Sequence, residues 1–365
     1  MKRMGLFICY ELKYLFRQRV LQFLVVAICL FTIYGAPTEM YPEDWDNSFY
    51  EKYEEDQSYE GMTDREITAI ESGKMKIEEI QNKRKSIYEM AVSQKQSLNE
   101  SESFQWEYLT GAEEIYGKEI FLRIGDYKGW ESYFASKAMM LGHSKMALFT
   151  LVILVSSGLF LLSKDRTNRT LFWSAYTGRG VTWSSYTIKL LAIFIYGFCV
   201  QLVQSMVQIL SLIFISKCDM SYWLEPIQNL SVFGTCCFSL NIVGLILLHM
   251  FLLNVAALFG ILFTVLFIRI LKKELLLFVG GIGVTGILYI HVYACDKSRI
   301  FDFFWRMNPL SVMQMDQFLQ YDVWNIGGHA VLAQLGTAGI WAVLLTALYV
   351  GAYHTWRGYL NEAEI

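Results

Sequence analysis

The chain of 365 residues has only four prolines, and no Asp, Glu, Lys or Arg stands near the centre of its long apolar runs. Because proline breaks helices, these runs are free to form continuous helices. Proton- and sodium-coupled carriers usually depend on ionisable groups inside the membrane, so a secondary transporter is disfavoured. There is also no HExxH zinc pair and no Cys-x-x-Cys, and the five histidines lie in separate segments. We therefore expect no enzyme, no metal site and no bound cofactor.

One stretch, GAEEIYGKE from Gly111, loosely resembles a phosphate-binding loop. It has five residues between its glycines where such a loop requires four, and Glu119 stands where Ser or Thr would bind magnesium. We therefore expect that this chain does not hydrolyse ATP by itself.

Charge is unevenly distributed along the chain. Residues 37–143 hold 23 of the 34 acidic residues and 12 of the 31 basic ones, so this segment has a net charge of −11 and the remainder of +8. The chain therefore consists of a polar acidic insert within an apolar remainder, which excludes a soluble enzyme. It also lacks the strongly basic domain that binding to nucleic acid requires.

Six apolar runs have about the length of roughly 20 residues that a helix needs to cross the core of a bilayer. They are residues 20–36, 145–162, 188–215, about 240–268, 274–294 and 336–356. The sequence therefore predicts an all-α polytopic membrane protein with six transmembrane helices. The limits of the fourth are the hardest to define.

Lys and Arg gather in four places: residues 1–19, the loop 163–189, the junction of the fourth and fifth runs, and the C-terminal tail. Such loops are typically cytoplasmic. Six crossings of the cell membrane would then leave both termini cytoplasmic and residues 37–143 extracellular. A cleaved signal peptide is disfavoured, because nineteen residues precede the first run and no clear small-x-small site follows it.

The acidic insert has the pattern of a mostly helical domain. Thr63 and Glu66 have the spacing of a capping box at the start of a helix. Apolar residues then recur at three- and seven-residue steps, as on one helical face: Ile67, Ile70, Ile77, Ile80, Ile87 and Met90. The second half of the insert is rich in aromatic residues, which we expect to pack against this face.

Residues 1–19 are predicted to form an amphipathic helix that lies at the cytoplasmic interface and contacts membrane lipid. It would bury the apolar residues Leu6, Phe7, Tyr10, Tyr14 and Leu15. The alternative is a plain positive flank of the first transmembrane helix.

The loop 163–189 is long and basic for a connector and contains five aromatic residues. A short helix within it would present an aromatic surface of the kind that protein interfaces favour. The alternative is an aromatic belt at the membrane surface. The length of the loop favours docking of another protein.

The third apolar run carries Gln201, Gln204, Ser205 and Gln208 at steps of three and four residues, on one helical face. These side chains are costly in a membrane unless they bond to neighbouring helices or to water. They line either a transport pathway or a helix interface.

Near the last run, Asn308 and Pro309 form an N-cap and first-turn pair. The helix that they begin is too short to span, so we expect the segment 300–325 to be re-entrant or to rest on the outer leaflet. Cys218 and Cys295 fall in predicted outer loops, where they are either paired or free.

In layout the chain resembles the permease subunits of type-2 ABC exporters. The resemblance lies in the interfacial start YELKYLFRQRVLQFL, the large outer insert, the basic loop after the second run, and Asn-Pro-Leu at 308–310. The family commonly shows an acid, Gly-Thr, two Leu, Ser, Arg and Lys in that loop. Here Asn168 and Arg169 replace the glycine, and LFWSA replaces the leucine pair.

This resemblance implies a coupling helix that docks on a separate ABC ATP-binding subunit, which binds ATP and magnesium. The implied contacts are Asp165, Thr170, Leu171, Phe172, Trp173, Tyr176 and Arg179. Two permease subunits, identical or homologous, would assemble with two ATPases. The segment 300–325, including Asn308 and Pro309, would form an outer gate. The expected function is export of an amphipathic peptide, antibiotic or lipid-like compound, as in antimicrobial peptide resistance.

Two rival classes remain. A membrane sensor or immunity protein would bind a peptide at its extracellular domain without transport, and would not need the docking loop. A membrane enzyme would need a polar catalytic cluster at the interface, and the sequence has none.

Overall fold

A computed structural model of the chain describes residues 2–35, 48–98, 103–134, 143–163, 183–271, 274–294 and 299–361. Most of these residues are helical, as the sequence predicts. The six apolar runs form α2 (Arg19–Tyr34), α7 (His143–Ser163), α9 (Trp183–Phe214), α10 (Ile242–Leu266), α12 (Glu274–Ala294) and α15 (Ala333–Asn361).

Within the described residues, α9, α10 and α15 are each long and apolar enough to cross a membrane. The amphipathic α1 (Lys2–Arg17) and α2 meet the same criteria as a pair, with a bend of 68° between them. The apolar parts of α7 and α12 are shorter. The chain is therefore a mostly helical, multi-pass membrane protein.

The helix α10 forms the centre of the apolar bundle, because it packs against α7, α9, α12 and α15. A close approach to α7 is possible at Gly158, where an added Cβ would lie 2.4 Å from Ile261 Cδ1. A short helix, α11 (Ile268–Leu271), follows α10 and contacts α12 and α15.

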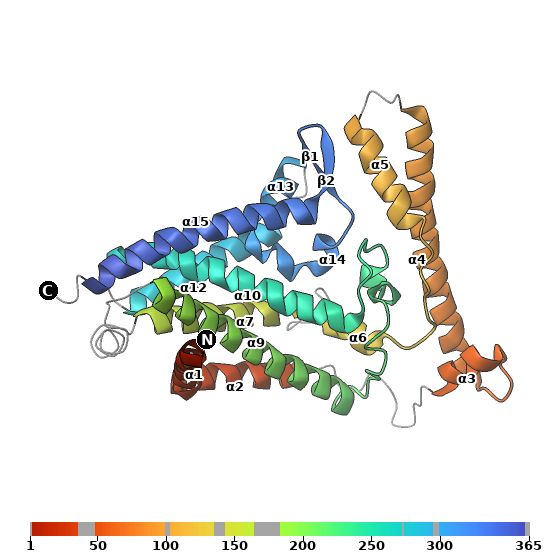
Figure 1. Ribbon diagram of the computed structural model, residues 1–365. Helices are drawn as coiled ribbons and strands as arrows, with labels where there is room; N and C mark the ends of the chain where they lie inside the picture. Colours follow the sequence, from red (N-terminus) through yellow and green to blue (C-terminus); the bar gives the residue numbers. More distant parts are fainter. Residues whose placement is uncertain are drawn as a thin grey trace.

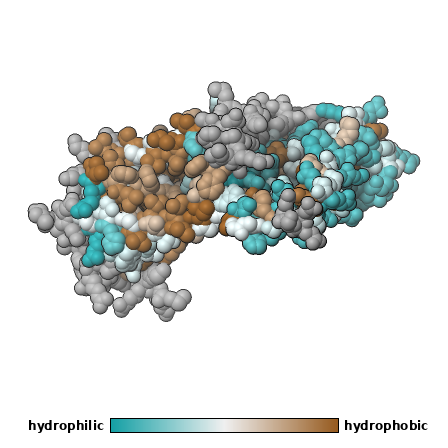
Figure 2. Space-filling view, turned by 90° about the horizontal axis from the view of Figure 1, so that it is seen from above, coloured by the Kyte–Doolittle hydropathy of each residue, from teal (hydrophilic) through white to brown (hydrophobic). Residues whose placement is uncertain are grey.

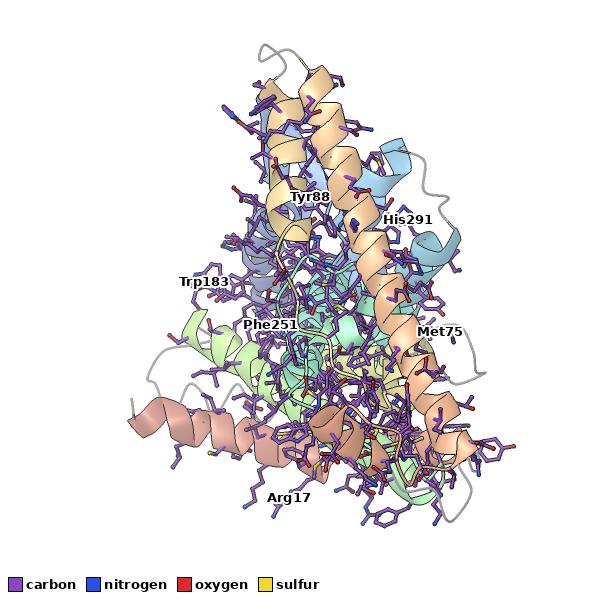
Figure 3. All side chains as sticks on the ribbon, turned by 90° about the vertical axis from the view of Figure 1, so that its right-hand side faces the viewer. Arg17, Met75, Tyr88, Trp183, Phe251 and His291 are labelled. Atoms are coloured by element: carbon purple, nitrogen blue, oxygen red, sulfur yellow. The ribbon has the colours of Figure 1, made fainter. Side chains whose placement is uncertain are left out.

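The insert folds as a helical domain of α3 (Ser48–Asp56), α4 (Asp64–Ser97), α5 (Ser103–Tyr116) and α6 (Lys128–Phe134). The predicted capping box at Thr63 and Glu66 is present at the start of α4. In the stripe on α4, Ile70 and Ile80 are buried, but the prediction for Met90 was wrong, because its side chain is 51% exposed. Tyr88, labelled in Figure 3, packs in the contact of α4 with α5.

The segment before α15 is more varied than the single short helix expected from Asn308 and Pro309. It contains α13 (Arg299–Met307), the 3-10 helix η4 (Pro309–Met313), α14 (Met315–Phe318) and an antiparallel hairpin of β1 (Val323–Ile326) and β2 (His329–Leu332). The hairpin turns at Gly327 and Gly328, both with positive φ, a conformation that glycine adopts readily. Two further 3-10 turns, η2 (Ile227–Asn229) and η3 (Ser231–Phe233), lie between α9 and α10.

Polar and apolar surfaces lie in different parts of the molecule. Figure 1 shows α1 and the C-terminal end of α15 at one end of the apolar bundle, and α3, α4 and α5 beyond the other end. In Figure 2 the apolar side chains cover the bundle and the hydrophilic ones cover the helical domain. The described part of the chain thus has one polar domain standing beyond one end of a membrane-type bundle.

Candidate functional site

The polar face of α9 points into the protein rather than toward lipid. Gln201 and Gln204 are buried, and Gln204 Oε1 accepts a hydrogen bond from the Thr150 hydroxyl of α7. Gln201 instead donates to the Gly197 carbonyl of its own helix. This face therefore lies at a helix–helix contact in the structure.

The polar domain reaches the same face through Tyr133 of α6. The Tyr133 hydroxyl donates to Ser205 Oγ at 2.8 Å, and Gln208 Nε2 donates to the Tyr133 carbonyl at 3.3 Å. The Tyr133 side chain is almost fully buried. There is no room for a side chain at Gly129, one turn earlier on α6, because an added Cβ would lie 2.6 Å from Met220 Sδ. The helix α6 is thus packed tightly at the end of this polar face that meets the polar domain.

A small cavity of about 20 Å³ lies beneath Tyr133. It is lined by polar side chains of α6, α9 and α10 together with apolar neighbours: Tyr133, Gln201, Gln204, Ser205, Gln208, His249, Ala147, Ile246, Met250 and Leu253. A cavity of this size and polarity holds about one water molecule. The four residues predicted for this face therefore line one small polar space. Tyr133 and Thr150 were missed, because nothing in their own segments marks them as partners of α9.

A buried ion pair joins α1 to the beginning of α9. Lys189 Nζ lies 3.1 Å from Glu11 Oε1, and both side chains are fully buried. Glu11 shares a helical face with the buried residues Phe7 and Leu15. Of the residues expected to be buried at the interface, Phe7 and Leu15 are buried within the protein, whereas Leu6 and Tyr10 are 65% and 44% exposed on its surface. The spacing of Phe7, Glu11 and Leu15 could have revealed this face, but a carboxylate is not expected on a buried surface without a partner.

The contacts implied for the ATPase, from Asp165 to Arg179, lie outside the described residues. Trp183, at the beginning of α9, stacks on Tyr353 of α15 with ring centroids 3.6 Å apart. The side chain of Trp183 can be followed in Figure 3. Cys295, the possible partner of Cys218, also lies outside the described residues.

Asn308 and Pro309 connect the segment before α15 to the bundle. Asn308 caps η4 by accepting from the Leu310 amide at 3.0 Å, as predicted, and its Nδ2 donates to the Leu288 carbonyl of α12 at 2.8 Å. Trp341 of α15 donates to the Met307 carbonyl at 3.0 Å. Asn308 therefore holds this segment against α12, and the neighbouring Met307 holds it against α15.

A groove of about 900 Å³ separates the polar domain from this segment. We call it the outer groove. One wall comes from the end of α4 and from α5, and the other from α13, residues 320–322 and β1. Its lining residues are Gln94, Ser97, Leu98, Phe104, Gln105, Tyr108, Leu109, Phe303, Arg306, Gln320, Tyr321, Asp322, Val323 and Trp324. Ligand pockets commonly have volumes of about 300–1,000 Å³.

Two buried or half-buried arginines fasten the polar domain to the loop between α9 and α10. Arg84 donates to the Ile115 carbonyl at 2.9 Å and to the Cys236 carbonyl at 3.4 Å, and burial lowers the pKa of its guanidinium. Arg123 forms two ion pairs, with its Nε 2.6 Å from Glu54 Oε2 and its Nη1 3.3 Å from Glu225 Oε1. Burial raises the pKa of the Cys236 thiol to about 11 and that of Cys237 to about 12. Both thiols are therefore protonated at neutral pH.

No group of three or more His, Cys, Asp or Glu side chains that could hold a metal ion occurs among the residues whose structure is described. Comparisons with protein-family models, with curated proteins and with solved structures give no match to this chain.

Proposed function

We propose that this chain is the membrane-spanning permease subunit of an ATP-driven exporter of the type-2 ABC class. The observation that carries the proposal is the pair Glu11–Lys189, which attaches the amphipathic α1 to the first turns of α9, a short way along the chain from the proposed ATPase contacts. A protein that docked on this loop would thereby act on α1 and α9 together. ATP and magnesium are bound by the separate ATPase, and the permease supplies the moving parts.

The buried ion pair suits a mechanical connection. Removing one partner of such a pair leaves a buried charge without compensation, so the two helices are costly to separate. Because α2 follows α1 at a bend of 68°, a movement of α1 also changes the position of α2. Displacement of the docking loop therefore shifts α1, α2 and α9 as a unit.

The polar face of α9 is the proposed pathway. Its glutamines supply hydrogen bonds that a passing molecule with polar groups requires inside a bilayer. In this structure Gln204 accepts from Thr150, and Gln208 donates to the Tyr133 carbonyl instead. The outward-open state requires that α6 and the segment 300–325 move away from the outer end of the bundle.

The proposed topology has six crossings of the cell membrane, with both termini cytoplasmic and residues 37–143 extracellular. It is supported by the placement of α1 and the end of α15 opposite the polar domain (Figure 1) and by the basic residues of the segments assigned to the cytoplasm. A functional exporter would contain a second copy of this chain or a homologous permease.

The test is purification of the full chain from its host in mild detergent, followed by mass spectrometry of the associated proteins. We expect an ABC ATP-binding subunit at near-equal stoichiometry. Replacement of Leu171, Phe172 and Trp173 by Ser should release the ATPase and leave the permease in the membrane. A matched control replaces Leu224, Phe121 and Trp223 by Ser, because these are the same residue types, exposed on the polar side of the molecule.

Retention of the ATPase by the first triple variant would show that the docking surface lies elsewhere. A chain that purifies alone, or with a histidine kinase, would contradict the exporter. The alternative function, a sensor or immunity protein that binds a peptide without transport, is favoured by one feature, the outer groove.

A further inference from the structure

The outer groove has the chemistry of a peptide site rather than that of a sugar site. Sugars stack on exposed ring faces, whereas the rings here contact one another. Tyr108 stacks on Tyr321 with ring centroids 5.5 Å apart, and Phe303 packs at a tilt against Trp324 with centroids 5.2 Å apart. Trp324 also lies against Gly336, where a Cβ would approach its ring to 2.4 Å. The ring edges that remain suit aliphatic and aromatic side chains.

Polar groups in the groove match the peptide backbone. The primary amides of Gln94, Gln105 and Gln320 line it, and each offers both donors and an acceptor. Gln94 and Gln105 are exposed on the wall formed by the polar domain. These amides can bond to the N–H and C=O groups of an extended or turned peptide segment.

The charges near the groove favour a cationic ligand. Arg306 lies 2.9 Å from Asp322, and Lys95 lies 2.7 Å from Glu113, so both cations are already neutralised. The helix α5, which forms much of one wall, carries three glutamates and no Lys or Arg. Glu113 pairs with Lys95 and Glu107 with His329, whereas Glu114 is exposed. The whole insert has a net charge of −11, which attracts positive ligands at long range.

From these observations we infer that the outer groove binds a segment of a cationic amphipathic peptide. The inference rests on the proposed export function, since such a peptide would be the molecule exported. The two walls belong to the polar domain and to the segment before α15, so a bound peptide bridges the parts that separate when the outer end opens.

The test uses the full chain in nanodiscs of zwitterionic lipid, with empty nanodiscs as the reference for lipid binding. The probes are a fluorescently labelled amphipathic peptide of Lys and Leu and its counterpart with Glu in place of Lys. Fluorescence anisotropy should give a Kd about tenfold lower for the Lys peptide. Equal binding of the two peptides, or binding no stronger than to empty nanodiscs, would overturn the inference.

Two double variants test whether the peptide binds in the outer groove. Gln94→Lys with Gln105→Lys adds two positive charges to the groove wall and should weaken binding of the Lys peptide by about tenfold. Gln81→Lys with Gln96→Lys adds the same charge on exposed positions of α4 that do not line the groove, and should change the Kd less than about twofold. Equal weakening by both double variants would mean that overall charge, not the groove, determines binding.

The experiments can contradict the exporter proposal and the peptide-binding proposal independently of each other. If the ATPase co-purifies but the Lys peptide does not bind, the exporter stands and its substrate is of another class. If the peptide binds in the groove but no ATPase co-purifies, the groove stands and the chain is a sensor.

Discussion

The hydroxyl of Tyr133 donates a hydrogen bond to Ser205 at 2.8 Å, which joins the polar domain to the polar face of an apolar helix. Tyr133 is almost fully buried and its carbonyl also accepts from Gln208, so α6 forms one wall of the polar cavity that Tyr133 lines. In the proposed exporter, α6 is therefore part of the outer closure, in addition to the segment 300–325.

Replacement of Tyr133 by Phe should open this closure more often. Loss of one net hydrogen bond costs about 1 kcal/mol, which corresponds to about a fivefold increase in the open population. The readout is modification of Ala147→Cys, which lines the cavity, by a membrane-impermeant thiol reagent in an otherwise cysteine-free chain. Tyr127→Phe is the control, since it removes a buried hydroxyl bonded to Asn229 and not to α9. Equal modification rates in the two variants would contradict a closing role for Tyr133.

Single substitutions in the pair Glu11–Lys189 should be strongly destabilising. Glu11→Gln or Lys189→Met leaves the other charge buried, at a cost of about 3–5 kcal/mol, and the double variant should recover much of the loss. The measurement is a double-mutant cycle of unfolding midpoints in detergent. Lys83→Met is the control, because Lys83 and its partner Glu79 are both exposed, and no measurable change is expected. A cycle with no coupling between Glu11 and Lys189 would remove the basis for linking α1 to α9.

Gly336→Ala should disturb the outer groove. The new Cβ would lie 2.4 Å from the Trp324 ring, and overpacking of this kind costs about 1–3 kcal/mol. Gly339→Ala, on the same helix with open space at the Cβ position, should be neutral or stabilising by up to about 1 kcal/mol. Thermal unfolding of the two variants tests this difference. A stable Gly336→Ala variant with unchanged Trp324 packing would be the contrary result.

Stability should fall at alkaline pH. Burial raises the pKa of Cys236 to about 11 and of Cys237 to about 12, from 9.0. A group whose folded pKa is raised binds its proton more tightly in the folded state, so its stabilisation is complete below pH 9 and is lost as the pH rises through the folded pKa values. Unfolding midpoints should be level from pH 7 to pH 8.5 and should decline by pH 10.

The variant in which both thiols are replaced by Ala tests the source of this decline. It should show a weaker dependence on pH above pH 9. If the dependence is unchanged, the buried tyrosines of the polar domain are responsible, since burial raises the pKa of Tyr116 to about 12.

Local features of this chain follow from the sequence alone. The six apolar helices, the capping box at Thr63 and Glu66, and the cap at Asn308 depend on contacts within a few residues, which composition and spacing reveal. The turn of the hairpin also had a local signal, Asn325 followed by Ile326 and two glycines, although no hairpin was predicted there.

Contacts between segments far apart in the chain were decided only by the tertiary structure. Glu11 meets Lys189 across 178 positions, and Tyr133 meets Ser205 across 72. Each of these side chains has a plausible local environment by itself, and only the packing of α1 and α6 against α9 gives it a partner. The sequence thus determined which helices form and which face of α9 is polar. The tertiary structure decided which groups cover that face, because burial of a polar group depends on the helix that packs against it.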